Sequence, residues 1–183
     1  MQPLQTDIAA SVIQTLVLYS LAEHQLGHAK CIRVTAAGHS FSVEDDGRGH
    51  AIDRAVEGSP YLDFIYRHLD FPYQQLEAKP IQLQGLGMSL LNRLCAELVV
   101  TVRRTGATLT LRFESGCLVS RELTEGMNSA TGIQVSGTVH HDLATAPLRQ
   151  ASLERWLGAV LAASPSLQLF FNGRQVERVE SGA

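Results

Sequence analysis

Apolar residues recur at helical spacing between residues 7 and 26, with Asp7 before them and Gly27 after them. This pattern predicts a helix that is capped by Asp7 and ends before Gly27. Two shorter runs follow at residues 31–36 and 41–45, and both have β character. A short connection joins them, so we expect a β-hairpin whose second strand ends in an acidic turn.

The middle of the chain has a less regular pattern. Residues 52–71 show a weak helical periodicity that is interrupted at residues 58–60. Residues 72–84 are polar, carry two prolines and are expected to form a loop. Residues 85–98 open with two glycines and continue with leucines at helical spacing, which predicts a helix.

Strand patterns dominate the remainder of the chain. Three runs of alternating apolar and polar residues predict an antiparallel meander with one face in water, at residues 98–104, 107–113 and 117–123. A strand at 131–139, a helix at 151–163 and a closing hairpin with an Asn-Gly turn follow. Helices grouped with a mixed, mostly antiparallel sheet indicate an α+β two-layer sandwich.

The composition narrows the class of protein. The chain has 183 residues, 45% of them hydrophobic, which suffices for one domain with its own core. Its net charge of −3 and the lack of a Lys/Arg run argue against direct capture of nucleic acid. Three cysteines without metal-binding spacing predict reduced thiols in a cytoplasmic protein. We see no leader peptide and no membrane span in the sequence.

The acidic turn EDDGRG at residues 44–49 is the main candidate for chemistry. One interpretation is a solvated surface turn, because Asp and Gly are ordinary turn residues. The other is a ligand-facing corner. There a carboxylate would accept a hydrogen bond from an amine, and glycines would let a flat ligand approach the backbone.

The order of GHAKCIRV, DDGRG, a long loop, GLGMSLLN, VTVRRTG and ESG resembles the ATPase domain of the DNA gyrase and topoisomerase IV B subunits. That domain belongs to the superfamily with the Bergerat (histidine kinase-like ATPase) fold. The resemblance covers most of the chain. It implies one nucleotide-binding domain over residues 1–183, with a lid-like loop at about 72–86 and no transducer, toprim or DNA-cleavage domain. ATP or ADP is the implied ligand.

The resemblance also assigns site residues. Asp45 corresponds to the acid that reads adenine. Arg48 corresponds to an arginine that pairs with an acid, which is Glu23 here, and Arg104 to an arginine at the pocket mouth. Each of these assignments has a purely structural alternative, such as an ion pair between Glu23 and Arg48 or a tight helix start at the glycines. The other nucleotide-binding positions that the resemblance implies are Gly47, Gly49, Gly85, Leu86, Gly87 and Thr131.

The first helix departs from the family. Aligning GHAK and Glu23 places Thr15 where the family has its general base and Tyr19 where it has the asparagine that holds magnesium. A threonine hydroxyl is too weak a base to activate water near neutral pH. A phenol is a poor partner for Mg²⁺. We therefore expect no catalytic residue and no metal, and Ile133 in place of a threonine removes one further polar contact.

Three functions stay open at this point. The first is a gyrase-B-like regulatory module that binds adenine nucleotide weakly and does not hydrolyse it. The second is a nucleotide-independent interaction module whose pocket is filled by Tyr19 and whose partner is a type II topoisomerase or a second copy. The third is an active ATPase or kinase that uses Glu23 or Glu44 as an unexpected base.

Overall fold

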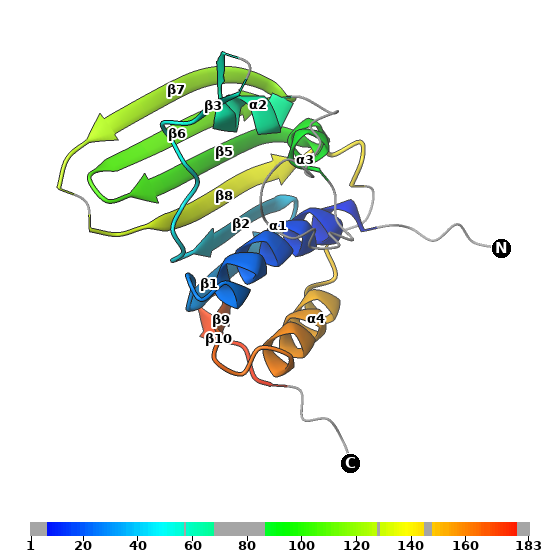
Figure 1. Ribbon diagram of the computed structural model, residues 1–183. Coiled ribbons are helices and arrows are strands. Elements are labelled where there is room, and N and C mark those ends of the chain that lie inside the picture. Colours follow the sequence, from blue (N-terminus) through cyan, green and yellow to red (C-terminus); the bar gives the residue numbers. More distant parts are fainter. Residues whose placement is uncertain (1–6, 57, 68–86, 128, 145–147, 179–183) are drawn as a thin grey trace.

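The computed structural model describes every residue except 1–6, 57, 68–86, 128, 145–147 and 179–183. One large sheet forms the first layer, and the described helices lie together against one of its faces (Figure 1). The helices are α1 (Ile8–Gln25), α2 (Tyr61–Arg67), α3 (Met88–Leu94) and α4 (Gln150–Ala162).

The large sheet is mixed and mostly antiparallel. From one edge to the other its strands are β10 (Arg174–Gln175), β9 (Gln168–Phe171), β1 (Cys31–Ala37), β2 (Ser40–Asp45), β8 (Gly132–Val139), β5 (Cys95–Arg104), β6 (Ala107–Glu114) and β7 (Cys117–Glu125). Among the described strands, only β1 and β9 pair in parallel. A second, two-stranded sheet pairs β3 (Ala55–Val56) with β4 (Ser59–Pro60). The α+β two-layer sandwich is therefore confirmed.

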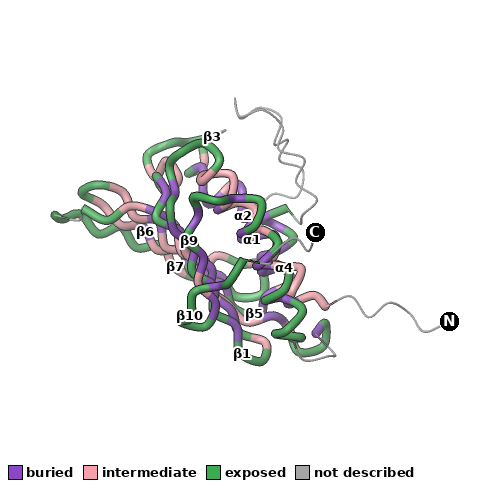
Figure 2. The backbone as a smooth tube through the Cα atoms, turned by 90° about the horizontal axis from the view of Figure 1, so that it is seen from below, coloured by how far each residue is buried: buried purple, intermediate pink, exposed green. Residues whose placement is uncertain are grey.

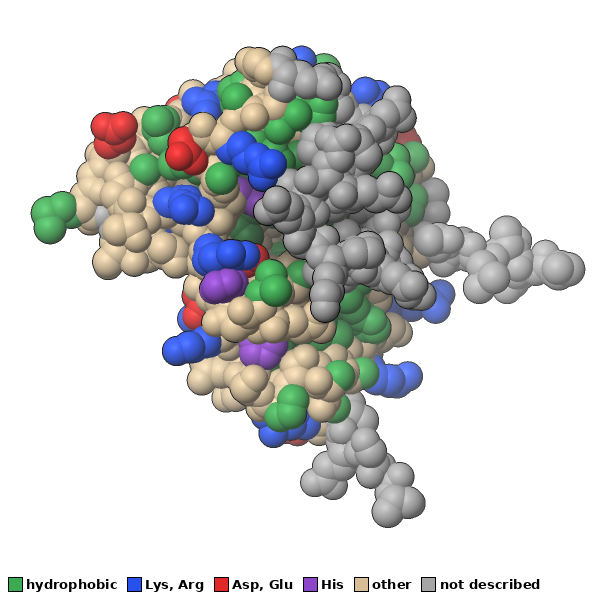
Figure 3. Space-filling model, viewed as in Figure 1, with side chains coloured by type: hydrophobic (Ala, Val, Ile, Leu, Met, Phe, Trp, Pro, Cys, Tyr) green, Lys and Arg blue, Asp and Glu red, His purple; other side chains and the backbone are tan. Residues whose placement is uncertain are grey.

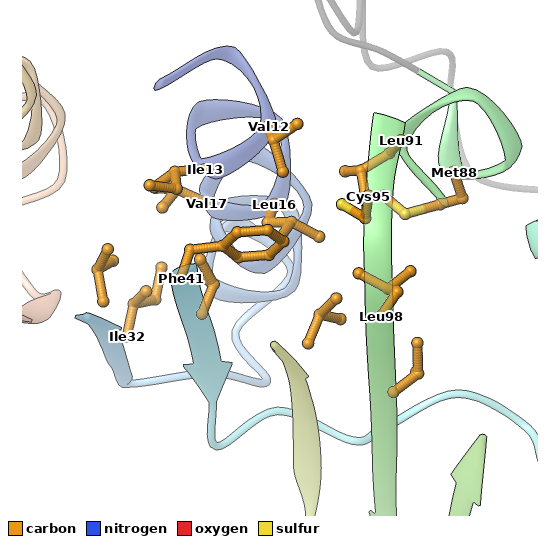
Figure 4. Packing of buried hydrophobic residues seen from close by; sticks show 14 of the residues in the cluster. Val12, Ile13, Leu16, Val17, Ile32, Phe41, Met88, Leu91, Cys95 and Leu98 are labelled. Carbon is orange, nitrogen blue, oxygen red and sulfur yellow. The ribbon is translucent and has the colours of Figure 1, made fainter. Parts of the chain in front are cut away.

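The first helix is held on the sheet by its apolar face. Asp7 caps it, because its carboxylate accepts a hydrogen bond from the Ala10 backbone N–H at 3.0 Å. Phe41 of β2 points toward the helix, and Figure 4 shows the side chains that meet there. Burial of each such side chain contributes about 1.5–3 kcal/mol, which an isolated helix would lack. The buried apolar residues of this face are Ala9, Val12, Ile13, Leu16 and Val17.

The core lies between the two layers. Figure 2 shows the buried residues concentrated where the helices face the strands, whereas the outer sides of both layers are exposed. Alternation along the strands accounts for this, because Leu109, Leu111 and Phe113 of β6 are buried and their neighbours are not. No helix among the described residues is long and apolar enough to cross a membrane.

The predicted helix at 85–98 is wrong over its last four residues, 95–98. Helix α3 ends at Leu94, and Cys95 begins β5, which pairs with β6 on one side and β8 on the other. The spacing of Cys95 and Leu98 fits one face of a helix. It also fits one face of a strand with a β-bulge, and the pairing register does shift between Cys95 and Glu97. Hydrogen bonding to β6 and β8 on its two sides makes this segment a strand and not a helix. Cys95 is buried as expected, and burial raises the pKa of its thiol to about 12.

The segment at 52–71 contains a helix that begins later than predicted, at Tyr61. Among the described residues of this segment, only those of α2 are helical, and residues before α2 form the β3–β4 hairpin around the interruption at 58–60. Residues 68–71 and the predicted loop at 72–84 lie outside the described residues. The hairpin at 31–45, the meander, the strand at 131–139 and the Asn-Gly hairpin are confirmed, with Asn172 and Gly173 both at positive φ.

Candidate functional site

A cavity of about 270 Å³ opens between the helices and the middle of the sheet. Helix α1 provides one wall, through residues three or four apart on one face. Helix α2 provides Tyr61, Ile65 and Tyr66, and Met88 comes from the start of α3. The floor is formed by the ends of β2 and β8. Most of the lining is thus apolar or aromatic, which is usual for a small-molecule site.

Asp45 is the buried acid of this cavity. It ends β2, whose alternate residues Phe41, Val43 and Asp45 are buried on the helix side. Asp45 is 2% exposed, and its carboxylate accepts hydrogen bonds from the Ser20 hydroxyl at 2.6 Å and the Gly47 N–H at 2.9 Å. Burial nevertheless raises the pKa of the Asp45 carboxyl, against the lowering effect of these hydrogen bonds. An amine donor entering the cavity would therefore find a poorly solvated acceptor.

The two neighbours of Asp45 point elsewhere. Glu44 lies on the opposite face of β2, where its carboxylate pairs with Arg103 at 2.7 Å. The Asp46 carboxylate accepts hydrogen bonds from the backbone N–H groups of Lys30 at 2.7 Å and Cys31 at 2.9 Å. Asp46 thus fixes the turn to the start of β1. Of the three acids at positions 44–46, only Asp45 lines the cavity.

Two glycines let the turn after β2 pack against the sheet. A Cβ at Gly49, where φ is +69°, would lie 2.7 Å from the Arg103 carbonyl oxygen. A Cβ at Gly132, where φ is +129°, would lie 2.0 Å from the carbonyl oxygen of Asp45. Neither position accepts a side chain without displacing backbone. This close approach sets the position of the carboxylate.

An ion pair forms the rim of the cavity. Glu23 of α1 accepts hydrogen bonds from Arg48 at 2.8 and 3.1 Å, one to each carboxylate oxygen. Burial acts to raise the pKa of Glu23, but the hydrogen bonds and charge of Arg48 outweigh it, and the pKa is lowered. Arg104 donates to the Gly49 carbonyl at 3.3 Å and so holds the turn.

The two divergent positions of α1 have different surroundings. Thr15 is 2% exposed, donates its hydroxyl to the Ser11 carbonyl at 2.8 Å, and is not among the residues that line the cavity. Tyr19, one turn later, does line it. The cavity stays open beside the tyrosine ring. Neither side chain supplies a carboxylate or an amide to this space.

The remaining sequence candidates are only partly brought together. Gly49 lines the cavity with Asp45, whereas Gly87 caps α3 and is exposed. Thr131 precedes β8 and does not line the cavity, whereas Ile133 of β8 does. Gly85 and Leu86 lie outside the described residues. Among the residues that the structure describes, no group of three His, Cys, Asp or Glu side chains could hold a metal ion.

Several lining residues were not predicted from the sequence. Ser20, the hydrogen-bond donor to Asp45, lies four residues after Leu16 and three before Glu23, so helical spacing could have placed it on the same face. Tyr61 and Tyr66 of α2 could not be placed in this way, because the helical periodicity at 52–71 is weak.

The sequence has relatives among type II topoisomerases, although it matches no protein-family model. The DNA topoisomerase 4 B subunit of Salmonella typhimurium is 36% identical over 109 residues, which are 56% of this chain and 17% of that protein. The DNA gyrase B subunit of Haloferax volcanii is 35% identical over 111 residues, with coverage of 57% and 17%. The chain thus spans less than a fifth of the length of these relatives.

Solved structures agree with these matches. The topoisomerase IV ATP-binding domain of Francisella tularensis, in complex with a small-molecule inhibitor, superposes with a TM-score of 0.77 and 21% identity, over 93% of this chain and 86% of that one. The 43K ATPase domain of Thermus thermophilus gyrase B, in complex with an aminocoumarin, superposes with a TM-score of 0.75 and 23% identity. That match covers 91% of this chain and 45% of the gyrase chain. The chain is homologous to the gyrase and topoisomerase IV B subunits over the matched residues, and it has the fold of their ATPase domains. The resemblance and the fold expected from the sequence are therefore confirmed.

Proposed function

We propose that this gyrase-B-like domain binds the adenine group of ATP or ADP weakly, without Mg²⁺, and does not hydrolyse the nucleotide. The observation that carries the proposal is the buried Asp45 carboxylate at the floor of an open, mostly apolar cavity. An exocyclic amine can donate to this acceptor, while the base contacts the apolar walls. The turn glycines keep the acceptor in place.

The absence of hydrolysis follows from the residues on α1. A general base must reach the water that it activates, and its pKa must suit the working pH. Thr15 is buried away from the cavity and has no basic group. Glu23 does line the cavity, but both of its oxygens are held by Arg48 and its pKa is lowered, which weakens it as a base. Glu44 lies on the other face of the sheet.

Calorimetric titration tests this function. ATP, ADP and a non-hydrolysable analogue should each give saturable heat with and without Mg²⁺, and phosphate release should stay at the level of the buffer. Asp45→Asn should abolish the heat, because its amide presents an N–H group where the ligand needs an acceptor. Absence of heat at millimolar ligand would remove the proposal. Turnover that survives purification and disappears with Glu23→Gln would replace it with an active ATPase.

A nucleotide-independent interaction module is the second candidate, and the outer edge of the sheet favours it. Among the described strands, β7 has a neighbour on one side only, and such a sheet edge can accept an added strand. Its residues Val119 and Leu123 are 52% and 49% exposed. If this candidate is right, Leu123→Lys weakens self-association or binding to a type II topoisomerase in sedimentation, and Asp45→Asn changes neither.

A further inference from the structure

The charges around the cavity are poorly suited to a polyphosphate. Among the described lining residues the acids are Glu23 and Asp45, and the only Lys or Arg is Arg48. Both oxygens of Glu23 already engage the Arg48 guanidinium, so its charge is compensated before any ligand arrives. His50 adds no charge near neutral pH, since burial lowers the pKa of its imidazole. The described lining is therefore acidic overall.

Arg54, Arg103 and Arg104 lie nearby, but none of them is among the residues that line the cavity. Arg103 pairs with Glu44 at 2.7 Å on the far face of the sheet, and Arg104 donates to the Gly49 carbonyl. Arg54 lies over the Tyr61 ring, 5.2 Å from its centroid. On the face seen in Figure 3, and apart from its grey atoms, Lys and Arg side chains stand among acidic and uncharged groups and form no continuous patch. Among the described residues that line the cavity, the one arginine that could meet a phosphate is thus Arg48, and Glu23 already holds its guanidinium.

The size and walls of the cavity favour a compact aromatic ligand. Its volume of about 270 Å³ is near the lower limit of the roughly 300–1,000 Å³ that is usual for ligand pockets. Tyr19 of α1 and Tyr61 and Tyr66 of α2 contribute aromatic surface, and Leu16 and Met88 contribute aliphatic surface. Such walls gain from contact with a flat, apolar ring and gain nothing from a hydrated phosphate chain.

We infer that this cavity selects an uncharged heteroaromatic amine of the adenosine type, and that phosphate groups on the ligand add no affinity. The amine donates to the Asp45 carboxylate, the ring lies against the tyrosine walls, and the Glu23–Arg48 pair remains closed. The inference rests on the proposed adenine-binding function, and goes beyond it by making the nucleoside the preferred ligand.

Titrations of the full chain with adenosine, AMP, ADP and ATP at one ionic strength test the inference. Adenosine should bind at least as tightly as ATP, and raising the salt concentration should not weaken it, because the complex involves no net ionic attraction. ATP that binds about tenfold or more tightly than adenosine would overturn the inference and leave the proposed function intact. If neither ligand binds, both are refuted.

A charge variant sharpens the comparison. Glu23→Gln removes one acid and releases the Arg48 guanidinium toward the cavity, so the ratio of the ATP to the adenosine dissociation constant should fall. Glu122→Gln, on exposed strand β7, makes the same change in net charge away from the cavity and should leave the ratio unaltered. An equal change in both variants, or no change in Glu23→Gln, would show that the rim ion pair does not exclude phosphate. Melting temperatures check that both variants are folded.

Discussion

Replacement of Asp45 by Asn and by Ala separates the hydrogen bonds of this residue from its charge. Both variants remove the buried carboxylate. Asn can still accept from the Gly47 N–H through its carbonyl and donate to the Ser20 oxygen through its amide. Ala leaves both buried partners without a bond, at about 1–3 kcal/mol for each. Loss of the desolvated charge offsets part of this, so we expect Asp45→Ala to cost about 2–4 kcal/mol and Asp45→Asn about 1 kcal/mol or less.

Thermal unfolding measures the difference directly. For a domain of this size each kcal/mol corresponds to about 2–4 °C, so Asp45→Ala should lower the melting temperature by about 5–15 °C at neutral pH. Asp45→Asn should stay within a few degrees of the native protein. Equal losses in the two variants would show that the charge, and not the hydrogen bonding, stabilises the turn.

The pH dependence supplies the second half of this prediction. The pKa of Asp45 is raised in the folded state, so folding is favoured by the protonated carboxyl and becomes less favourable as pH rises through the folded pKa. The Asp45→Asn variant has no ionisable group at this position, so its stability does not fall with pH for this reason. Its unfolding free energy relative to the native protein should therefore increase from pH 4 to pH 7. A relative decrease over the same range would mean that the carboxylate is stabilised by its surroundings, and would refute the effect assigned to burial.

Three further predictions test other parts of the structure. Gly132→Ala should destabilise the fold by more than about 4 kcal/mol, since its Cβ would overlap the Asp45 carbonyl, and a melting temperature near the native value would contradict the turn geometry. Leu111→Ala, at a fully buried position of the meander, should lower the free energy of unfolding in urea by about 2–5 kcal/mol, and a loss below about 1 kcal/mol would place it outside the core. Thr15→Glu buries an ionisable group, so its melting temperature should fall more at pH 8 than at pH 5; an equal fall would indicate that the new carboxylate reaches solvent.

Local patterns were sufficient to predict much of the fold. The cap at Asp7, the alternation in β6 and the Asn-Gly turn each act through neighbouring residues, and the sequence shows them directly. The end of α3 could not be predicted in this way. Residues after Leu94 satisfy two periodicities, and only pairing with β6 and β8 selects the strand. The parallel pairing of β9 with β1 is likewise a long-range contact.

The site was predictable to the extent that it is local in sequence. The acidic turn was identified, but which of its acids enters the cavity depends on the pleat of β2 and on the Asp46 contacts with the backbone of residues 30 and 31. The aromatic wall was missed, because Tyr61 and Tyr66 approach α1 only through the packing of α2. In our proposal, this aromatic wall makes the cavity favour a nucleoside over a nucleotide.

Titration of ATP into the native protein, followed by assay of the same sample for ADP, tests the central proposal most directly. We predict saturable heat, loss of that heat in Asp45→Asn, and recovery of the ATP intact. No heat at millimolar ATP, or ADP formed by the native protein and not by the variant, would contradict it.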